Sequence, residues 1–122
     1  MATEPKPRIR KVWLPAEMKV ALREYCWRHR TKPSPFVVGI IQEVIESPHH
    51  FEDFEIPPAG QDHMSLYVYD EVWEAGLKAA EVYGVHLSAI IRAGIARELA
   101  TEGIPWAVST VRPRTDRIPI QE

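Results

Sequence analysis

The sequence predicts a mostly α-helical fold in which one strand-helix-helix unit occurs twice. Residues 8–46 contain a β-prone segment, a proline, a helical pattern, a polar break and a second helical pattern, and residues 63–102 repeat that order with Asp70 in place of the proline. A repeat of this length indicates that one supersecondary unit is used more than once. A unit of roughly 40 residues rarely buries enough apolar surface to be stable alone. The two units are therefore expected to pack on each other as an internal pair.

The two units align with a small change of spacing. Pro15 is matched with Asp70 and Leu22 with Leu77, at an offset of 55, and Ser34 with Ser88 at an offset of 54. The second unit is therefore expected to be one residue shorter between its helices. The expected organisation is a flexible arm at 1–7, a single domain at 8–103 made of repeats 8–47 and 63–103 with a linker at 48–62, and an extended tail at 104–122.

In the first unit, the β-prone segment RIRKVWL (8–14) is predicted to be a strand, and Pro15 can open the helix that follows. Apolar residues then recur at helical spacing from Met18 onward. Ser34 followed by Pro35 is typical of an N-cap and the first residue of a helix. The segment FVVGIIQEVIE gives this second helix a broad apolar face.

The second unit follows the same order. MSLYVY (64–69) is strongly β-prone, Asp70 is a good N-cap, and Gly84 and Gly103 are expected to end the two helices. Helical spacing predicts a shared apolar core that includes Phe36, Ile41, Trp73, Leu77, Ile91 and Ile95.

The charge is distributed unevenly along the chain. Residues 1–32 hold nine Lys or Arg and three Glu, whereas residues 33–103 hold three basic and twelve acidic residues. A basic end on an otherwise acidic protein can orient the molecule toward a polyanion such as nucleic acid. A set of solvated helix faces would give the same composition.

Several classes of function are not expected from this sequence. No apolar run approaches the roughly 20 residues that a membrane-spanning helix needs, and no secretory signal is recognisable. Cys26 is the only cysteine, which is compatible with a cytoplasmic protein. His49, His50 and the acidic residues around them lack metal-site spacing, so no metal and no cofactor are expected. No catalytic constellation is present, and the chain is not expected to be an enzyme.

The second unit resembles the two helices of the ribbon-helix-helix DNA-binding family. The family's G-x-x-x-S-x-x-[IL]-R turn is present at Gly84, Ser88, Ile91 and Arg92, whereas the first unit, with KPSPFVV, lacks the turn glycine and the Arg. Two units in one chain resemble the tandem members of the family, which fold as an intramolecular pseudo-dimer. The resemblance implies an antiparallel two-stranded ribbon in the DNA major groove, with the N-termini of the second helices near phosphates.

Strand alternation predicts which ribbon residues would face DNA. The resemblance places Leu14 and Tyr69 on the core side. The outward residues would then be Ile9, Lys11 and Trp13 in the first strand, beside Met64, Leu66 and Val68 in the second.

An apolar second strand is poorly suited to base recognition, which leaves three alternatives. The ribbon contacts thymine methyl groups with little discrimination, or it is shifted by one residue, or the C-terminal tail covers it. A one-residue shift exchanges the two faces and would turn Arg8, Arg10, Ser65 and Tyr67 outward.

The candidate DNA-binding residues follow from these alternatives. Arg8, Arg10 and Lys11 can reach phosphates with either face outward, unless they are merely solvated. Trp13 either inserts into the groove or packs on its own helix. Lys32, Ser34, His86 and Ser88 lie at helix starts, as phosphate contacts or as caps. Arg92, one turn into its helix, is either a phosphate contact or a surface or ion-pairing residue. The complete candidate set is Arg8, Arg10, Lys11, Trp13, Lys32, Ser34, Leu66, Tyr67, Val68, His86 and Ser88.

The resemblance to the tandem members of the family implies a double-stranded DNA-binding accessory protein that assists plasmid or T-DNA processing and transfer. Its binding would depend mainly on phosphates, with weak sequence specificity. Relaxase or another DNA-processing protein is the expected partner, and the protein alone is expected to be a monomer. The alternatives are a transcriptional repressor and an antitoxin-like protein-interaction module whose ribbon has lost DNA binding.

Overall fold

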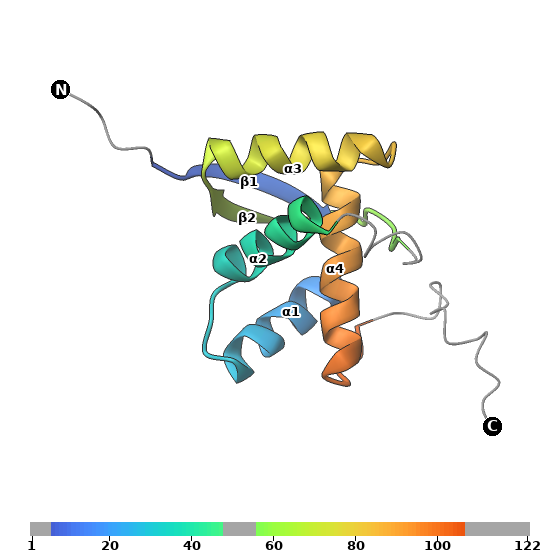
Figure 1. Cartoon of the computed structure of the whole chain (residues 1–122). Coiled ribbons are helices and arrows are strands. Elements are labelled where there is room, and N and C mark those ends of the chain that lie inside the picture. Colours follow the sequence, from blue (N-terminus) through green and yellow to red (C-terminus); the bar gives the residue numbers. More distant parts are fainter. Residues whose placement is uncertain (1–5, 48–55, 107–122) are drawn as a thin grey trace.

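The computed structural model describes residues 6–47 and 56–106, which form two strands and four helices (Figure 1). In chain order these are β1 (Arg8–Leu14), α1 (Ala16–Arg28), α2 (Pro33–Glu46), β2 (Asp62–Val68), α3 (Asp70–Val82) and α4 (Leu87–Thr101). The predicted order, strand-helix-helix twice in a mostly helical chain, is confirmed. The beginning of the arm, residues 48–55 of the linker and the tail from residue 107 lie outside the described residues.

The two units repeat at a single offset of 54. β2 begins 54 residues after β1, α3 begins 54 residues after α1, and α4 begins 54 residues after α2. The predicted offset of 55 in the first helix is wrong, because Asp70 is the first residue of α3 and not its N-cap. The N-caps are Pro15, with φ −62° and ψ 145°, and Tyr69, with φ −66° and ψ 144°. Any residue can adopt this extended conformation, so Tyr69 occupies the position of a proline without resembling one.

The two strands pair antiparallel, with Arg8 opposite Val68 at one end and Leu14 opposite Asp62 at the other. The central pair is Lys11 with Ser65. These two residues are themselves 54 apart, so an approximate two-fold axis that relates the units passes through this pair.

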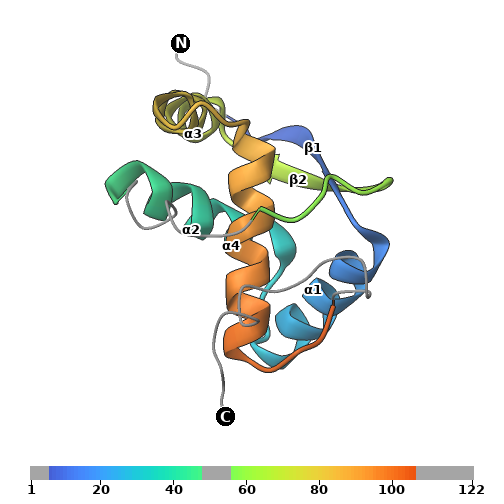
Figure 2. The same ribbon diagram turned by 90° about the vertical axis from the view of Figure 1, so that its right-hand side faces the viewer.

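The helices cover one face of this two-stranded ribbon, and Figure 2 shows the strands at the side of the helical body. The covered strand residues are Val12, Leu14, Met64, Leu66 and Val68, all buried. α2 packs on α3 and α4 packs on α1, so each helix pair joins the two units. The core is therefore shared, as expected for units too small to be stable alone.

Most of the predicted core residues are buried. Ile41, Ile91 and Ile95 are fully buried, and Phe36 and Trp73 are partly buried against the core. Leu77 is 45% exposed, so its prediction as a core residue is wrong.

The wrong prediction that Leu77 is a core residue follows from the wrong offset of 55 between the first helices. With an offset of 54, the position of buried Leu22 in the second unit is Gly76, which is also buried. A Cβ at Gly76 would lie 2.7 Å from the Ile41 Cγ2, so α3 approaches α2 too closely for a side chain there.

Three helices end in the same hydrogen-bonded motif, with a left-handed residue directly after the C-cap. Gly84 after α3 and Gly103 after α4 both have φ 68°, as predicted for helix-ending glycines. The equivalent residue after α1 is Arg30, with φ 52°. The Thr31 N–H donates to the Cys26 carbonyl at 2.9 Å and completes the motif despite the strained residue.

We expect Arg30→Gly to stabilise the protein by about 1 kcal/mol, because the left-handed conformation costs an L-residue roughly that amount. Gly84→Ala should destabilise by a similar amount, since a Cβ at Gly84 meets no atom within 4 Å and only the backbone cost remains. Urea unfolding of both variants measures the two effects. Shifts of the same sign in the two variants would contradict this explanation.

α2 and α4 cross where a large residue faces a small one. Ile40 and Gly94 are equivalent positions in the two units, and a Cβ at Gly94 would lie 2.6 Å from the Ile40 Cγ2. A symmetric pair of chains would place identical residues at both positions. The single chain instead combines a bulky residue with a glycine and brings the two helices close together.

Gly94→Ala is expected to destabilise the protein by about 1–3 kcal/mol, the usual cost of overpacking a core. Gly39→Ala is the matched control, because a Cβ there meets nothing within 4 Å. This control should stabilise α2 by roughly 0.5–1 kcal/mol, the helix preference of alanine over glycine. Thermal or urea unfolding compares them, and equal effects would show that the Ile40 contact is unimportant.

Candidate nucleic-acid interface

The outward face of the ribbon consists of three cross-strand pairs. The pairs are Ile9 with Tyr67, Lys11 with Ser65, and Trp13 with His63. The exposed fractions of Ile9, Tyr67 and Trp13 are 60%, 56% and 48%, so this face is open to solvent. β1 therefore presents the residues predicted for it. β2 presents His63, Ser65 and Tyr67 instead of the predicted Met64, Leu66 and Val68.

The prediction that Leu66 and Val68 face DNA is wrong, because both are fully buried. The prediction assumed that Leu14 and Tyr69 occupy equivalent positions, whereas the observed offset pairs Leu14 with Val68. An error of one residue exchanges every side chain in a strand between its two faces. Tyr67, which was a candidate only if the ribbon was shifted, is outward.

The corrected face contains hydrogen-bonding groups across its whole length. Lys11 and Ser65 supply an ammonium and a hydroxyl at the centre, and Tyr67 supplies a phenol at one end. At the other end the rings of Trp13 and His63 lie 5.1 Å apart at 57°. Donors and aromatic edges of this kind can contact bases or phosphates.

Arg8 and Arg10 lie at one end of the ribbon and share an acidic partner. The Arg8 Nη1 lies 3.4 Å from the Asp70 Oδ2, and the Arg10 guanidinium donates to the Asp70 Oδ1. The Arg10 guanidinium also lies 5.2 Å from the centre of the Trp73 ring. Arg10 is therefore on the helix-covered side and partly buried, and only the Arg8 side chain, 68% exposed, extends into solvent.

The second helices of both units begin beside the ribbon. α2 starts two residues earlier than predicted, with Lys32 as N-cap and Pro33 as its first residue, because proline suits that position. α4 has His86 as N-cap, and neither N-cap makes a side-chain capping bond. Lys32 and His86 are exposed, and Ser34 and Ser88 are partly buried.

The two helix starts differ in the donors that they offer an anion. Pro33 and Pro35 have no N–H group, so Ser34 is the only donor among the first three residues of α2. The first three residues of α4 are Leu87, Ser88 and Ala89, which all carry N–H groups. The start of α4 is therefore the better anion site by backbone donors, while α2 has the cationic Lys32.

Ser34 also binds the ribbon itself. The Tyr67 N–H donates to the Ser34 Oγ at 2.9 Å, which joins α2 of the first unit to β2 of the second. The predicted capping role of Ser34 is wrong, because the serine lies inside the first turn and accepts a strand N–H instead.

Arg92 holds the other strand and is buried, so the expected surface position is wrong, and its contacts with the described residues are hydrogen bonds to two backbone carbonyls. Its side chain is 8% exposed. Its Nε donates to the Pro57 carbonyl at 3.0 Å and its Nη1 to the Trp13 carbonyl at 3.3 Å. Burial lowers the pKa of this guanidinium from its usual value. Arg92 thus connects α4, β1 and the segment that leads into β2.

A second residue fixes the same segment against β1. Gly60 has φ 74°, and a Cβ there would lie 2.3 Å from the Pro15 nitrogen. Only glycine fits such a close backbone approach. Sequence reasoning did not identify Gly60, although a glycine after two prolines in an irregular segment is a recognisable signal.

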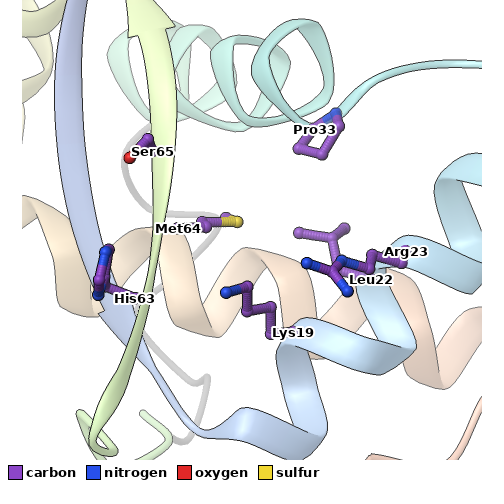
Figure 3. Close-up of a pocket in the computed structure, with 7 residues that line it drawn as sticks. All are labelled: Lys19, Leu22, Arg23, Pro33, His63, Met64 and Ser65. Atoms are coloured by element: carbon purple, nitrogen blue, oxygen red, sulfur yellow. The ribbon is translucent and has the colours of Figure 1, made fainter.

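A hollow of about 290 Å³ lies between α1, the start of α2 and β2 (Figure 3). Lys19 and Arg23 extend from α1 toward the strand, and Met64 points from β2 into the same space. The Lys19 Nζ lies 3.5 Å from the Asp62 Oδ1. The hydrogen bond from the His63 N–H, with smaller effects from Lys19, lowers the pKa of Asp62. This hollow adds cationic side chains beside the ribbon.

Within 6–47 and 56–106, no group of three or more His, Cys, Asp or Glu residues is placed to hold a metal ion. None of the described helices is long and apolar enough to cross a membrane.

Comparisons with known proteins identify no relative of this chain. It matches no protein-family model, no curated protein and no solved structure.

Arg92→Met should destabilise the protein by about 2–3 kcal/mol, because it leaves the carbonyls of Pro57 and Trp13 without their charged donor. Val38 is the equivalent residue in α2, and Val38→Met is the matched control that should change stability by less than about 1.5 kcal/mol. Urea unfolding measures both variants. If Arg92→Met lowers the free energy of unfolding by no more than Val38→Met does, these hydrogen bonds are unimportant for stability.

Proposed function

We propose that this protein is a tandem ribbon-helix-helix protein, an intramolecular pseudo-dimer that binds double-stranded DNA through the outward face of its ribbon. The observation that carries this proposal is the corrected face, in which Lys11 lies at the centre between polar and aromatic residues of both strands. A two-stranded ribbon of this kind fits the DNA major groove, which distinguishes all four base pairs.

The surroundings of the ribbon support contact with two phosphate backbones. α2 contacts β2 through Ser34 in its first turn, and α4 contacts β1 through Arg92, its sixth residue, so each of these helices reaches one strand. N–H groups at a helix start and nearby cations favour a phosphate. Lys32 and Arg23 add positive charge on the side of the first unit, where Lys19 is paired with Asp62.

The unequal units favour a non-palindromic DNA site. Across the two-fold axis, Ile9 is equivalent to His63, Lys11 to Ser65 and Trp13 to Tyr67. The two halves of the face therefore present different chemistry, whereas a palindrome suits two identical halves. Phosphate contacts contribute most of the affinity, with modest sequence preference.

The biological role that we propose is an accessory function in plasmid or T-DNA processing and transfer in the cytoplasm. Its support is the tandem pattern of the two units together with the basic charge of the first unit. The protein would bind duplex near a processing site and position it for a relaxase. The alternative of a protein-interaction module loses its motivation, since Met64, Leu66 and Val68 are buried and not on the outer face.

Lys11→Gln should weaken duplex binding about tenfold, roughly the 1.4 kcal/mol of one charge-assisted contact. It should also reduce the slope of log K against log salt by about one, the signature of one lost phosphate contact. Fluorescence anisotropy with a duplex short enough for one molecule measures both. Lys78→Gln is the matched control, because it removes the same charge from an exposed position on α3.

Equal affinity of the Lys11→Gln variant and the native protein would contradict binding through the ribbon. Affinity that does not fall as salt rises would contradict the phosphate-dominated mechanism. A large preference for one operator over random duplex would instead favour the transcriptional repressor.

A further inference from the structure

The outer side of α1 carries two strongly exposed apolar residues. Trp27 is 81% exposed and Val20 is 65% exposed. They are seven residues apart and therefore lie on the same side of the helix. Tryptophan is highly buried on average in folded proteins, and it is enriched among residues that dominate protein interfaces. The core of this protein makes no use of the Trp27 side chain.

The outer side of α3 has a hollow at the position equivalent to that of Trp27 on α1. Leu77, 45% exposed, lies at its edge, and its volume is about 320 Å³. The hollow is shallow and open, with room for an indole ring. Its lining residues are Leu77, Glu81, Gly84, Val85, His86 and Leu87.

The two outer sides differ in a systematic way. At equivalent positions, an apolar residue on one helix replaces a charged residue on the other, and one position carries opposite charges. The pairs are Val20 and Glu74, Arg23 and Leu77, Glu24 and Lys78, and Trp27 and Glu81.

The net charges of the two segments are also opposite. Residues 16–32 contain five Lys or Arg and two Glu, while the equivalent residues 70–86 contain one Lys and four acidic residues. Contact between two α1 surfaces would bring like charges together, and so would contact between two α3 surfaces. Contact between α1 and α3 pairs opposite charges and places a projecting ring against a hollow.

We infer that α1 of one molecule docks on α3 of a second copy of this chain, with Trp27 in the hollow beside Leu77. α1 and α3 lie on opposite sides of the molecule in both views (Figures 1 and 2). Each molecule therefore keeps one free α1 and one free α3 after docking. Such a head-to-tail interface is heterologous and adds further copies in an open series.

This association does not depend on the proposed DNA binding. The outward ribbon residues belong to β1 and β2 and take no part in the docking, whereas the start of α4, with His86 and Leu87, lines the hollow and is also the proposed phosphate contact. Copies in such a series could each use their own ribbon. The monomer expected from the sequence is the form at low concentration.

Sedimentation velocity over a range of protein concentrations tests the interface without DNA. The native protein should form a series of species that grows with concentration and shrinks as salt rises. Trp27→Ala and Leu77→Arg should each lower the association constant about thirtyfold or more, the loss expected for a central interface residue. Val82→Arg is the matched control, because Val82 is 78% exposed on α3 but does not line the hollow.

Mixing the two variants distinguishes docking of α1 on α3 from a contact between two α1 surfaces or between two α3 surfaces. The Leu77→Arg variant keeps Trp27, and the Trp27→Ala variant keeps the hollow, so an equal mixture should form dimers and nothing larger. Each variant alone should remain monomeric. Circular dichroism confirms that both are folded, as expected for changes at exposed positions.

Three results would overturn the proposal. The first is a native protein that stays monomeric up to its solubility limit. The second is association that neither Trp27→Ala nor Leu77→Arg reduces, or that Val82→Arg reduces equally. The third is a mixture of variants that remains monomeric although the native protein associates, which would indicate a symmetric contact. None of these results bears on duplex binding by the ribbon.

Discussion

The antiparallel pairing of β1 with β2 is the interaction on which the rest of the structure depends. Each unit supplies one strand, and neither strand has another partner among the described elements. The register with Lys11 opposite Ser65 places Val12 beside Met64 on the inner face and therefore directs both apolar sets onto the helices. A shift of one residue in either strand would expose that strand's apolar set and bury its polar set.

Joining two such units in one chain allows each position to differ from its counterpart. Ile40 packs against Gly94 at the helix crossing, and Leu22 is replaced by Gly76 where α3 approaches α2. Identical subunits would have to place the same residue on both sides of the axis. Arg92 is a further consequence, since it binds the single segment that leads from one unit to the other.

The same freedom separates the surfaces by function. Polar and aromatic residues of both strands line the outward ribbon, and Trp27 of α1 and Leu77 of α3 are not among them. The ribbon residues are therefore separate from the docking residues, while Arg23 and the start of α4 belong to both proposed surfaces. The charge asymmetry of the sequence is compatible with a polyanion partner for the ribbon and, between α1 and α3, with contact between copies.

The sequence by itself determined the order of the elements, the repeat and the helix-ending glycines, because these follow from local propensity and periodicity. Only the tertiary structure decided the outward side of β2, which depends on pairing register and on where α3 starts. It also decided that Arg10 and Arg92 are internal and that Leu77 is exposed. Arg10 binds Asp70, and Arg92 binds the carbonyls of Pro57 and Trp13. These partners lie far away in the chain, so no local sequence pattern encodes the contacts.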